Sequence, residues 1–90
     1  MTPKDAIALQ NLLGMAAGHP VEIMRGTAAL LGTRHDQYQV MPGLCSMDDP
    51  AVDKYWSWSL RNKKQWHASP VQAALQYQLN WREWKSTVAE

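Results

Sequence analysis

The side chains best suited to bind a metal ion are three histidines and one cysteine: His19, His35, Cys45 and His67. They are separated by 16, 10 and 22 positions along the chain. Structural zinc sites usually bring their ligands in close pairs, so that one turn of the chain fixes two metal bonds. Because no such pair exists here, we expect no metal site and no cofactor.

Two groups of charged residues have the residue types needed for acid–base chemistry. Arg34-His35-Asp36 places a base beside an acid, and Asp48 and Asp49 are paired carboxylates. Neighbours in sequence rarely converge on one substrate, and no nucleophile is fixed beside His35. The Asp pair is better explained as the cap of a following helix. The chain also lacks a Gly-rich phosphate loop, G-x-S-x-G and H-E-x-x-H, so we expect a protein that is not an enzyme.

Basic and aromatic residues are concentrated in the C-terminal half. Residues 54–82 hold five basic and six aromatic side chains and no acid. This mixture is typical of protein-interface hot spots. It also resembles surfaces that hold single-stranded nucleic acid, with phosphates on cations and bases stacked on rings. The net charge of only +1 is weak for a dedicated nucleic-acid binder and favours the protein interface.

We predict a partner-binding surface in the segment 54–66 together with the preceding loop, 42–49. Trp56, Trp81 and Trp84 are expected in the core. Trp58 and Trp66 lie off the main apolar face and compete for the remaining space in a small core. The predicted contact residues are Leu44, Trp58, Arg61, Lys63, Lys64 and Trp66.

Three segments share a helix-start pattern in which a capping side chain precedes a proline: Thr2-Pro3, Asp49-Pro50 and Ser69-Pro70. The first helix should cover residues 3–17, because Gly18 suits a left-handed terminus and Pro20 prevents continuation. This helix is apolar on most faces, so it is either central in the core or partly covered by a partner. The core position is favoured.

The last helix should cover about residues 70–87 and carries two apolar stripes. One stripe places Tyr77, Trp81 and Trp84 on the same face. The second consists of Val71, Leu75 and Leu79. Either both stripes face one core, or one of them docks on another molecule.

Three stretches are ambiguous between helix, strand and loop. Residues 20–31 have a helical stripe with Gly32 as a possible stop, but Val21-Glu22-Ile23 alternates like a strand. Residues 32–48 are interpreted as a long connection in which 37–40 is a possible short strand. Residues 54–60 fit a helix, although Trp56-Ser57-Trp58-Ser59-Leu60 also alternates with the strand period.

Low β-branched content and the three helix starts favour a mainly α fold. We predict a three- or four-helix bundle with a long loop at 32–48 and at most a small hairpin near 55–68. The alternative is an α+β fold, with a short antiparallel sheet formed by 37–41, 55–60 and 64–68 between two helices.

Ninety residues allow one domain, residues 1–90. The chain has no apolar run of the ~20 residues needed to cross a membrane, and its first residues lack the pattern of a secretory signal. A single cysteine allows no intrachain disulfide. These features predict a cytoplasmic protein without membrane contact.

In its size, tryptophan content and lack of catalytic motifs, the chain resembles small accessory proteins carried by phages and other mobile elements. This general resemblance covers the whole chain and depends on no specific motif. It implies a protein that inhibits or modulates a host nucleic-acid-processing enzyme or a defence complex during host takeover. We therefore expect a small protein-binding module with a larger protein or complex as its partner. Direct nucleic-acid binding through 54–66 is the alternative.

Overall fold

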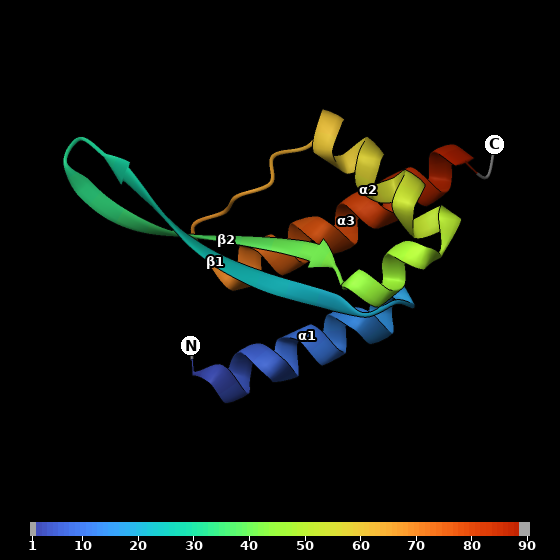
Figure 1. Cartoon of the computed structure of the whole chain (residues 1–90), viewed down its shortest axis with the longest axis horizontal. Coiled ribbons are helices and arrows are strands. Elements are labelled where there is room, and N and C mark those ends of the chain that lie inside the picture. The colour runs from blue at the N-terminus through green and yellow to red at the C-terminus, as the bar shows by residue number, and fades with distance from the viewer. Residues whose placement is uncertain (1, 89–90) are drawn as a thin grey trace.

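The computed structural model describes residues 2–88, in which a two-stranded sheet lies against three α-helices (Figure 1). The elements, in chain order, are α1 (Pro3–Ala17), β1 (Val21–Leu30), β2 (Thr33–Pro42), the 3-10 helix η1 (Leu44–Asp48), α2 (Pro50–Asn62) and α3 (Pro70–Val88). The architecture is α+β, with helix predominating. Of the two predicted fold classes, the α+β alternative describes it better.

The three predicted helix starts are confirmed. Each capping bond runs from a backbone N–H to a side-chain oxygen, joining Asp5 to Thr2 (3.2 Å), Ala51 to Asp49 (2.9 Å) and Gln72 to Ser69 (3.1 Å). Gly18 ends α1 in the left-handed conformation, with φ of 79°. Both ends of α1 therefore lie where the caps predicted them.

The sequence left helix and strand open for residues 20–31, and the structure shows a strand there. The long loop predicted at 32–48 is wrong, because residues 33–42 form a second strand. Residues 21–42 form an antiparallel hairpin, with a register that runs from Val21 opposite Pro42 to Leu30 opposite Thr33. The two turn residues, Leu31 and Gly32, both have positive φ, at 53° and 79°. Two such residues are what a type I′ turn requires. Gly32 therefore turns a hairpin instead of ending a helix.

The helix favoured for residues 54–60 is confirmed, no hairpin forms near 55–68, and the strand that the alternative fold placed at 55–60 is wrong. Residues 50–62 form α2, because the Asp49 cap and Pro50 start a helix there. The segment 64–68 contributes a single bridge, between His67 and Tyr38. The strand predicted at 37–41 is confirmed as part of β2.

One face of the hairpin closes the core over the helices. Val21 and Val40 are buried on this face, and Ile23 packs beside them. Leu13 and Ala17 of α1 join the same cluster. Side chains alternate between the faces of a strand, so the even-numbered residues of β1 lie on the opposite, outer face.

An aromatic cluster fills the rest of the core. Tyr55 is fully buried at its centre, and its ring centroid lies 4.8 Å from that of Trp81 and 5.4 Å from that of Tyr77. Edge-to-face pairs of this kind add stability beyond the buried area. The predicted core positions of Trp56 and Trp84 are confirmed because both are buried, while Trp81 is partly buried against the cluster.

The central position predicted for α1 is wrong. Only Leu13 and Ala17 of this helix are buried, while Ile7, Leu12 and Met15 are exposed. The hairpin and α3 occupy one side of the helix and leave the other without cover. The apolar outer face of α1, with Leu12 and Met15, is therefore exposed on this chain.

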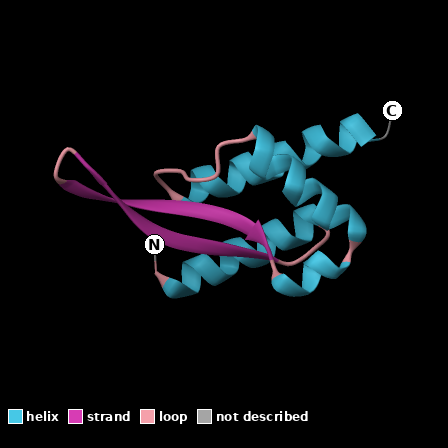
Figure 2. Ribbon diagram, turned by 45° about the horizontal axis from the view of Figure 1, so that its top comes forward, coloured by secondary structure: helices cyan, strands magenta, loops and turns pink. Residues whose placement is uncertain are grey.

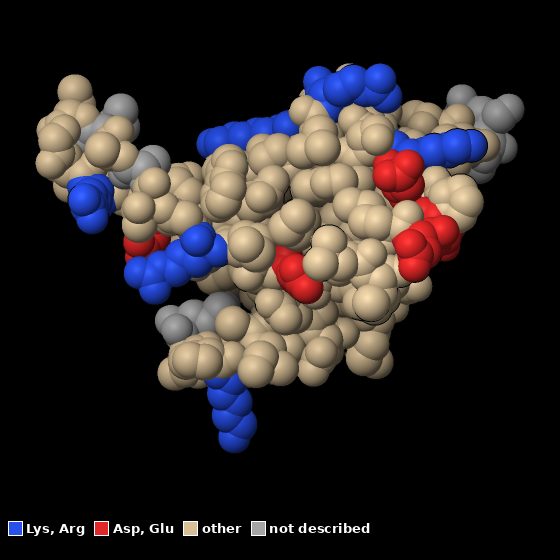
Figure 3. All heavy atoms as spheres, in the orientation of Figure 1, with Lys and Arg blue, Asp and Glu red and all other residues tan. Residues whose placement is uncertain are grey.

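The turn end of the hairpin extends beyond the helices as an arm, seen on the left of Figures 1 and 2. The radius of gyration is 13.6 Å, compared with about 12 Å for a compact chain of this length. Basic side chains lie along the arm and at its base (Figure 3).

Candidate functional site

The segment that links α2 to α3 is fixed against the edge of β2. The backbone N–H of Tyr38 donates to the carbonyl oxygen of His67 (2.8 Å), and the N–H of His67 donates to that of Tyr38 (2.9 Å). The Gln65 side chain also donates to the carbonyl oxygen of Ser59 at the end of α2 (2.9 Å). These bonds hold Trp66, between Gln65 and His67, in a defined position.

Trp66 lies over the outer face of the hairpin at Gly26. A Cβ at Gly26 would lie 3.2 Å from Cζ3 and 3.3 Å from Cη2 of the indole, which is closer than ordinary van der Waals contact. Glycine at this strand position is therefore explained by the close approach of the ring. Trp66 keeps 40% of its surface exposed.

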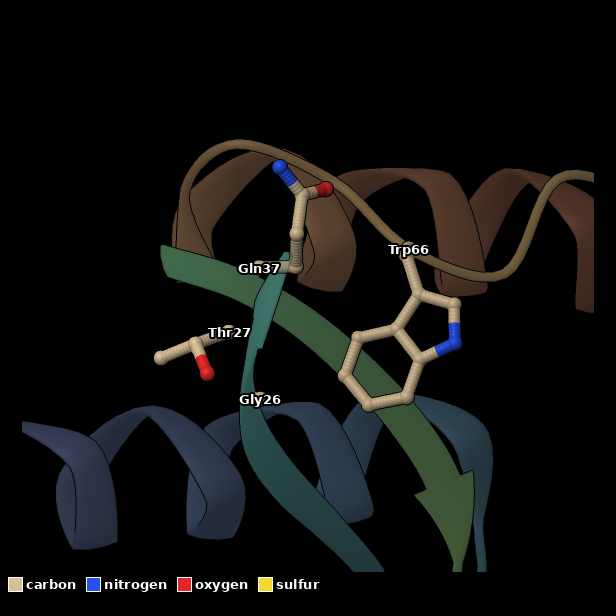
Figure 4. Close-up of a pocket in the computed structure, with 4 residues that line it drawn as sticks. All are labelled: Gly26, Thr27, Gln37 and Trp66. Carbon is tan, nitrogen blue, oxygen red and sulfur yellow. The ribbon is translucent and has the colours of Figure 1, made fainter. Parts of the chain in front are cut away.

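A cavity of about 290 Å³ lies beside the ring and is lined by Gly26, Thr27, Gln37 and Trp66 (Figure 4). We call it the Trp66 cleft. Its apolar wall is the edge of the indole, and Gln37 lines it from β2, whereas the Thr27 side chain points away from the indole. Since a water molecule occupies about 30 Å³, the cleft has room for one large side chain. Its chemistry suits an apolar or aromatic group that carries a donor or an acceptor.

The arm continues from the Trp66 cleft to the turn. The side chains described for its turn end, including those of residues 33–36, are exposed. Leu31 at the turn is 97% exposed and has the left-handed φ that Gly, Asn and Asp adopt more readily. An isolated two-stranded hairpin is only marginally stable in water. The arm is thus a protruding element with an apolar tip and little support from the rest of the fold.

The structure divides the predicted contact residues among several places. Leu44 is 81% exposed in η1, at the end of α2 opposite the segment that carries Trp66 (Figure 1). Trp58 is half-buried and packs against the core cluster. Leu44 and Trp66 therefore do not share one surface.

The predicted cations also differ in their surroundings. Lys63 pairs with Glu83 (2.7 Å), and its Nζ lies 5.6 Å from the centroid of the Trp58 ring. Lys63 is thus largely occupied within the fold. Arg61 and Lys64 are exposed, and no ion pair within residues 2–88 involves either of them.

Sequence reasoning identified Trp66 but missed the hairpin residues that complete the cleft, Gly26, Thr27 and Gln37. A glycine within a strand often marks a close approach, so Gly26 carried a signal once the alternation at 21–23 was taken as a strand. Gln37 carried no such signal in the sequence, because its position beside Gly26 depends on the pairing of β2 with β1.

The candidate metal ligands are dispersed. No group of three His, Cys, Asp or Glu side chains in the described part of the chain could hold a metal ion. His19 is buried, and its Nε2 lies 2.6 Å from the hydroxyl oxygen of Tyr77. Burial lowers the pKa of His19 below its ordinary value of 6.5, so the fold favours the neutral imidazole.

No helix within residues 2–88 combines the length and apolar character needed to cross a bilayer. Comparisons with protein-family models, with curated proteins and with solved structures found no match to this chain.

Proposed function

We propose that this chain is a small, non-enzymatic protein-binding module and that the Trp66 cleft and the arm form its contact surface. One observation carries the proposal. Trp66 is held by backbone bonds over a glycine, with part of its ring exposed beside a cavity that the ring itself walls. Interface hot spots are enriched in tryptophan that fits a pocket or lines one.

The energetic gain from covering the ring is large for a single residue. At 40% exposure, the indole leaves on the order of 100 Å² in water. Covering that area would contribute about 2–3 kcal/mol at ~25 cal/mol per Å². That magnitude is typical of a hot-spot residue.

The tip of the arm supports the same proposal. A leucine in the left-handed conformation costs roughly 1–2 kcal/mol compared with its preferred backbone, and the Leu31 side chain is 97% exposed. Local strain is most often found where a residue serves binding. A partner that covers Leu31 and pairs along the arm would bury this side chain and support the hairpin.

The remaining predicted contact residues keep a place in this proposal. Arg61 and Lys64 are exposed cations at the end of α2 and in the linker before Trp66, available to a partner that extends from the cleft along this linker. Leu44 is a separate apolar contact, available to a partner large enough to extend along α2. A larger protein or complex, such as a host nucleic-acid-processing enzyme or a defence complex, has the required size.

The test is affinity capture from lysate of the native host, with and without nuclease. The wild-type chain is compared with the variants Trp66→Ala and Gly26→Val, and with the matched control Leu60→Lys, which changes an exposed residue of α2 away from the cleft. We expect one protein to be retained by the wild-type chain and the control, and lost by both cleft variants. Equal capture by all four chains would refute the cleft as the contact surface.

Direct binding of single-stranded nucleic acid is the second candidate, favoured by the exposed indole close to Lys64. A base could stack on Trp66 while a phosphate contacts the cation. The test is a salt titration of a fluorescent oligothymidine of about twenty nucleotides. Phosphate binding predicts an affinity that falls steeply with salt, whereas the protein-binding proposal predicts little affinity for the oligonucleotide at any salt concentration.

A further inference from the structure

A second apolar surface lies where α1 and α3 run side by side. It consists of five large aliphatic side chains that are 51–80% exposed: Leu12, Met15, Val71, Leu75 and Leu79. We call it the two-helix face. A groove of about 170 Å³ runs between the helices, with Leu12 and Ala16 on one wall and Val71 and Leu75 on the other. The face is therefore continuous across both helices.

The two-helix face carries no charge over most of its length. Residues 6–17 of α1 and 70–81 of α3 contain no Asp, Glu, Lys or Arg. In Figure 3 the surface along α1 is almost entirely tan, and the charged side chains gather along the other edges of the molecule. A partner recognised by its charge would find nothing to pair with here, whereas an equally uncharged surface fits without desolvating an ion.

The two-helix face supplies more than half of the area, about 800 Å², that one partner contributes to a standard dimer interface. The chain exposes 6130 Å², while a compact monomer of 10.2 kDa is expected to expose about 5300 Å². The excess, on the order of 800 Å², equals the area that one partner contributes to a standard interface. The arm accounts for part of this excess. The five side chains of the two-helix face supply on the order of 500 Å², at the upper end of what soluble monomers leave exposed.

We propose that the occupant of the two-helix face is a second copy of this chain, bound about a two-fold axis. An isologous contact brings the same patch of both copies together, so a neutral, apolar face meets its own complement. The small side chains of Ala8 and Ala16, on the same helix as Leu12, allow the helices of the two copies to approach closely. The ridges of α1 and α3 then pack into the facing grooves, as in four-helix bundles.

The dimer contact does not use the Trp66 ring, although Leu75 and Leu79 also line a depression with Lys64 and His67, which flank that residue. Ile23 packs on the helix side of the hairpin, and Gly26, three residues further along β1, faces the opposite side toward Trp66. Dimerisation through the helices would therefore leave the cleft and the arm of each copy accessible. The assembly would present two copies of the contact surface to a larger partner.

The test is sedimentation equilibrium of the full chain at loading concentrations from about 1 µM to 1 mM, a range that covers weak and standard interfaces. We expect a reversible monomer–dimer equilibrium. The double variant Leu12→Lys/Leu75→Lys should weaken dimerisation at least roughly 100-fold, because it places charges in a buried apolar contact. The matched control Leu60→Lys, which changes a residue 52% exposed in α2, and the cleft variant Gly26→Val should both dimerise as the wild-type chain does.

A chain that stays monomeric over the whole range would overturn the proposal, as would a dimer that survives the double variant or an assembly larger than two. Far-UV circular dichroism checks that the double variant is folded. Methyl NOEs between labelled and unlabelled copies of the wild-type chain provide a second measurement that needs no variant. Contacts from the methyl groups of Leu12, Leu75 and Leu79 support the proposal, and contacts confined to other residues overturn it. Binding of the monomer to neutral phosphatidylcholine vesicles, with no dimer formed, would identify a lipid surface as the occupant instead.

Discussion

Replacing Gly26 by valine should displace Trp66 and lower the stability of the fold. The site leaves little room for a side chain, since a Cβ alone would lie 3.2 Å from the ring. The backbone of Gly26 has no positive φ, so valine is compatible with the strand itself. The substitution therefore tests the contact with the ring and not the backbone.

The expected loss of stability in Gly26→Val can be worked out from the surface of Trp66 that is buried in the fold. Trp66 is 40% exposed, so roughly 150 Å² of its surface is covered in the fold. At ~25 cal/mol per Å² this is an upper limit of about 3–4 kcal/mol. Valine itself stabilises the strand by about 1 kcal/mol relative to glycine, because it is less flexible in the unfolded chain and prefers strands. This gain offsets part of the loss. We expect Gly26→Val to lower the free energy of unfolding by about 2 kcal/mol.

Urea unfolding followed by far-UV circular dichroism measures the effect, and Gly26→Ala is the matched control. Alanine needs the ring to move by only a small distance, and the exposed edge of Trp66 allows this. It should therefore change stability by less than about 1 kcal/mol. If the valine variant is as stable as the alanine variant, Trp66 does not pack on Gly26 as described.

Three further predictions concern the turn, a buried histidine and a helix cap. Leu31→Asn should raise the free energy of unfolding by about 0.5–1 kcal/mol, because asparagine adopts the left-handed turn conformation more readily; unchanged urea midpoints would contradict the assigned turn. Acidification from pH 7 to pH 5 should lower stability. Burial lowers the pKa of His19 below 6.5, so the unfolded chain takes up the proton before the folded chain does. The His19→Gln variant should show a shallower pH dependence, and an equal slope would exclude His19 as a cause. Asp49→Ala should cost about 1 kcal/mol, because the N–H of Ala51 loses its acceptor; a thermal melt at neutral pH checks this.

The helix boundaries could be predicted because their signals are local. Thr2, Asp49 and Ser69 each cap the residues that immediately follow them, and Gly18 ends α1 within its own turn. Such short-range hydrogen bonds depend on a few adjacent residues. The same local signals favoured a helix over a strand at 54–60, despite the alternating tryptophans, and the structure confirms the helix.

The hairpin could not be predicted because its signals are shared with a helix. Val21, Met24, Ala28 and Leu31 have helical spacing, and Gly32 suits the end of a helix as well as a turn. Asn-Gly or Asp-Gly would have indicated a hairpin, whereas Leu31-Gly32 did not. Pairing with β2 decides between the two structures, and that pairing is a tertiary interaction.

The candidate site was predictable only in part for the same reason. Competition for a small core indicated that Trp58 or Trp66 would stay near the surface. The bond between His67 and Tyr38, which places Trp66 over the hairpin, joins residues far apart in sequence. The uncharged stripe of Val71, Leu75 and Leu79 was visible from the start, but whether it lay inside or outside depended on how α1 packed.

The central claim is that a partner protein covers Trp66, and fluorine NMR tests it most directly. The chain contains five tryptophans, and incorporation of 5-fluorotryptophan gives each of them its own resonance, with Trp66→Phe assigning the one of interest. On addition of the captured partner protein, we expect the Trp66 resonance to shift the most and the resonances of the buried Trp56 and Trp84 to keep their chemical shifts. A saturating partner that leaves the Trp66 resonance unshifted would contradict the proposed contact surface.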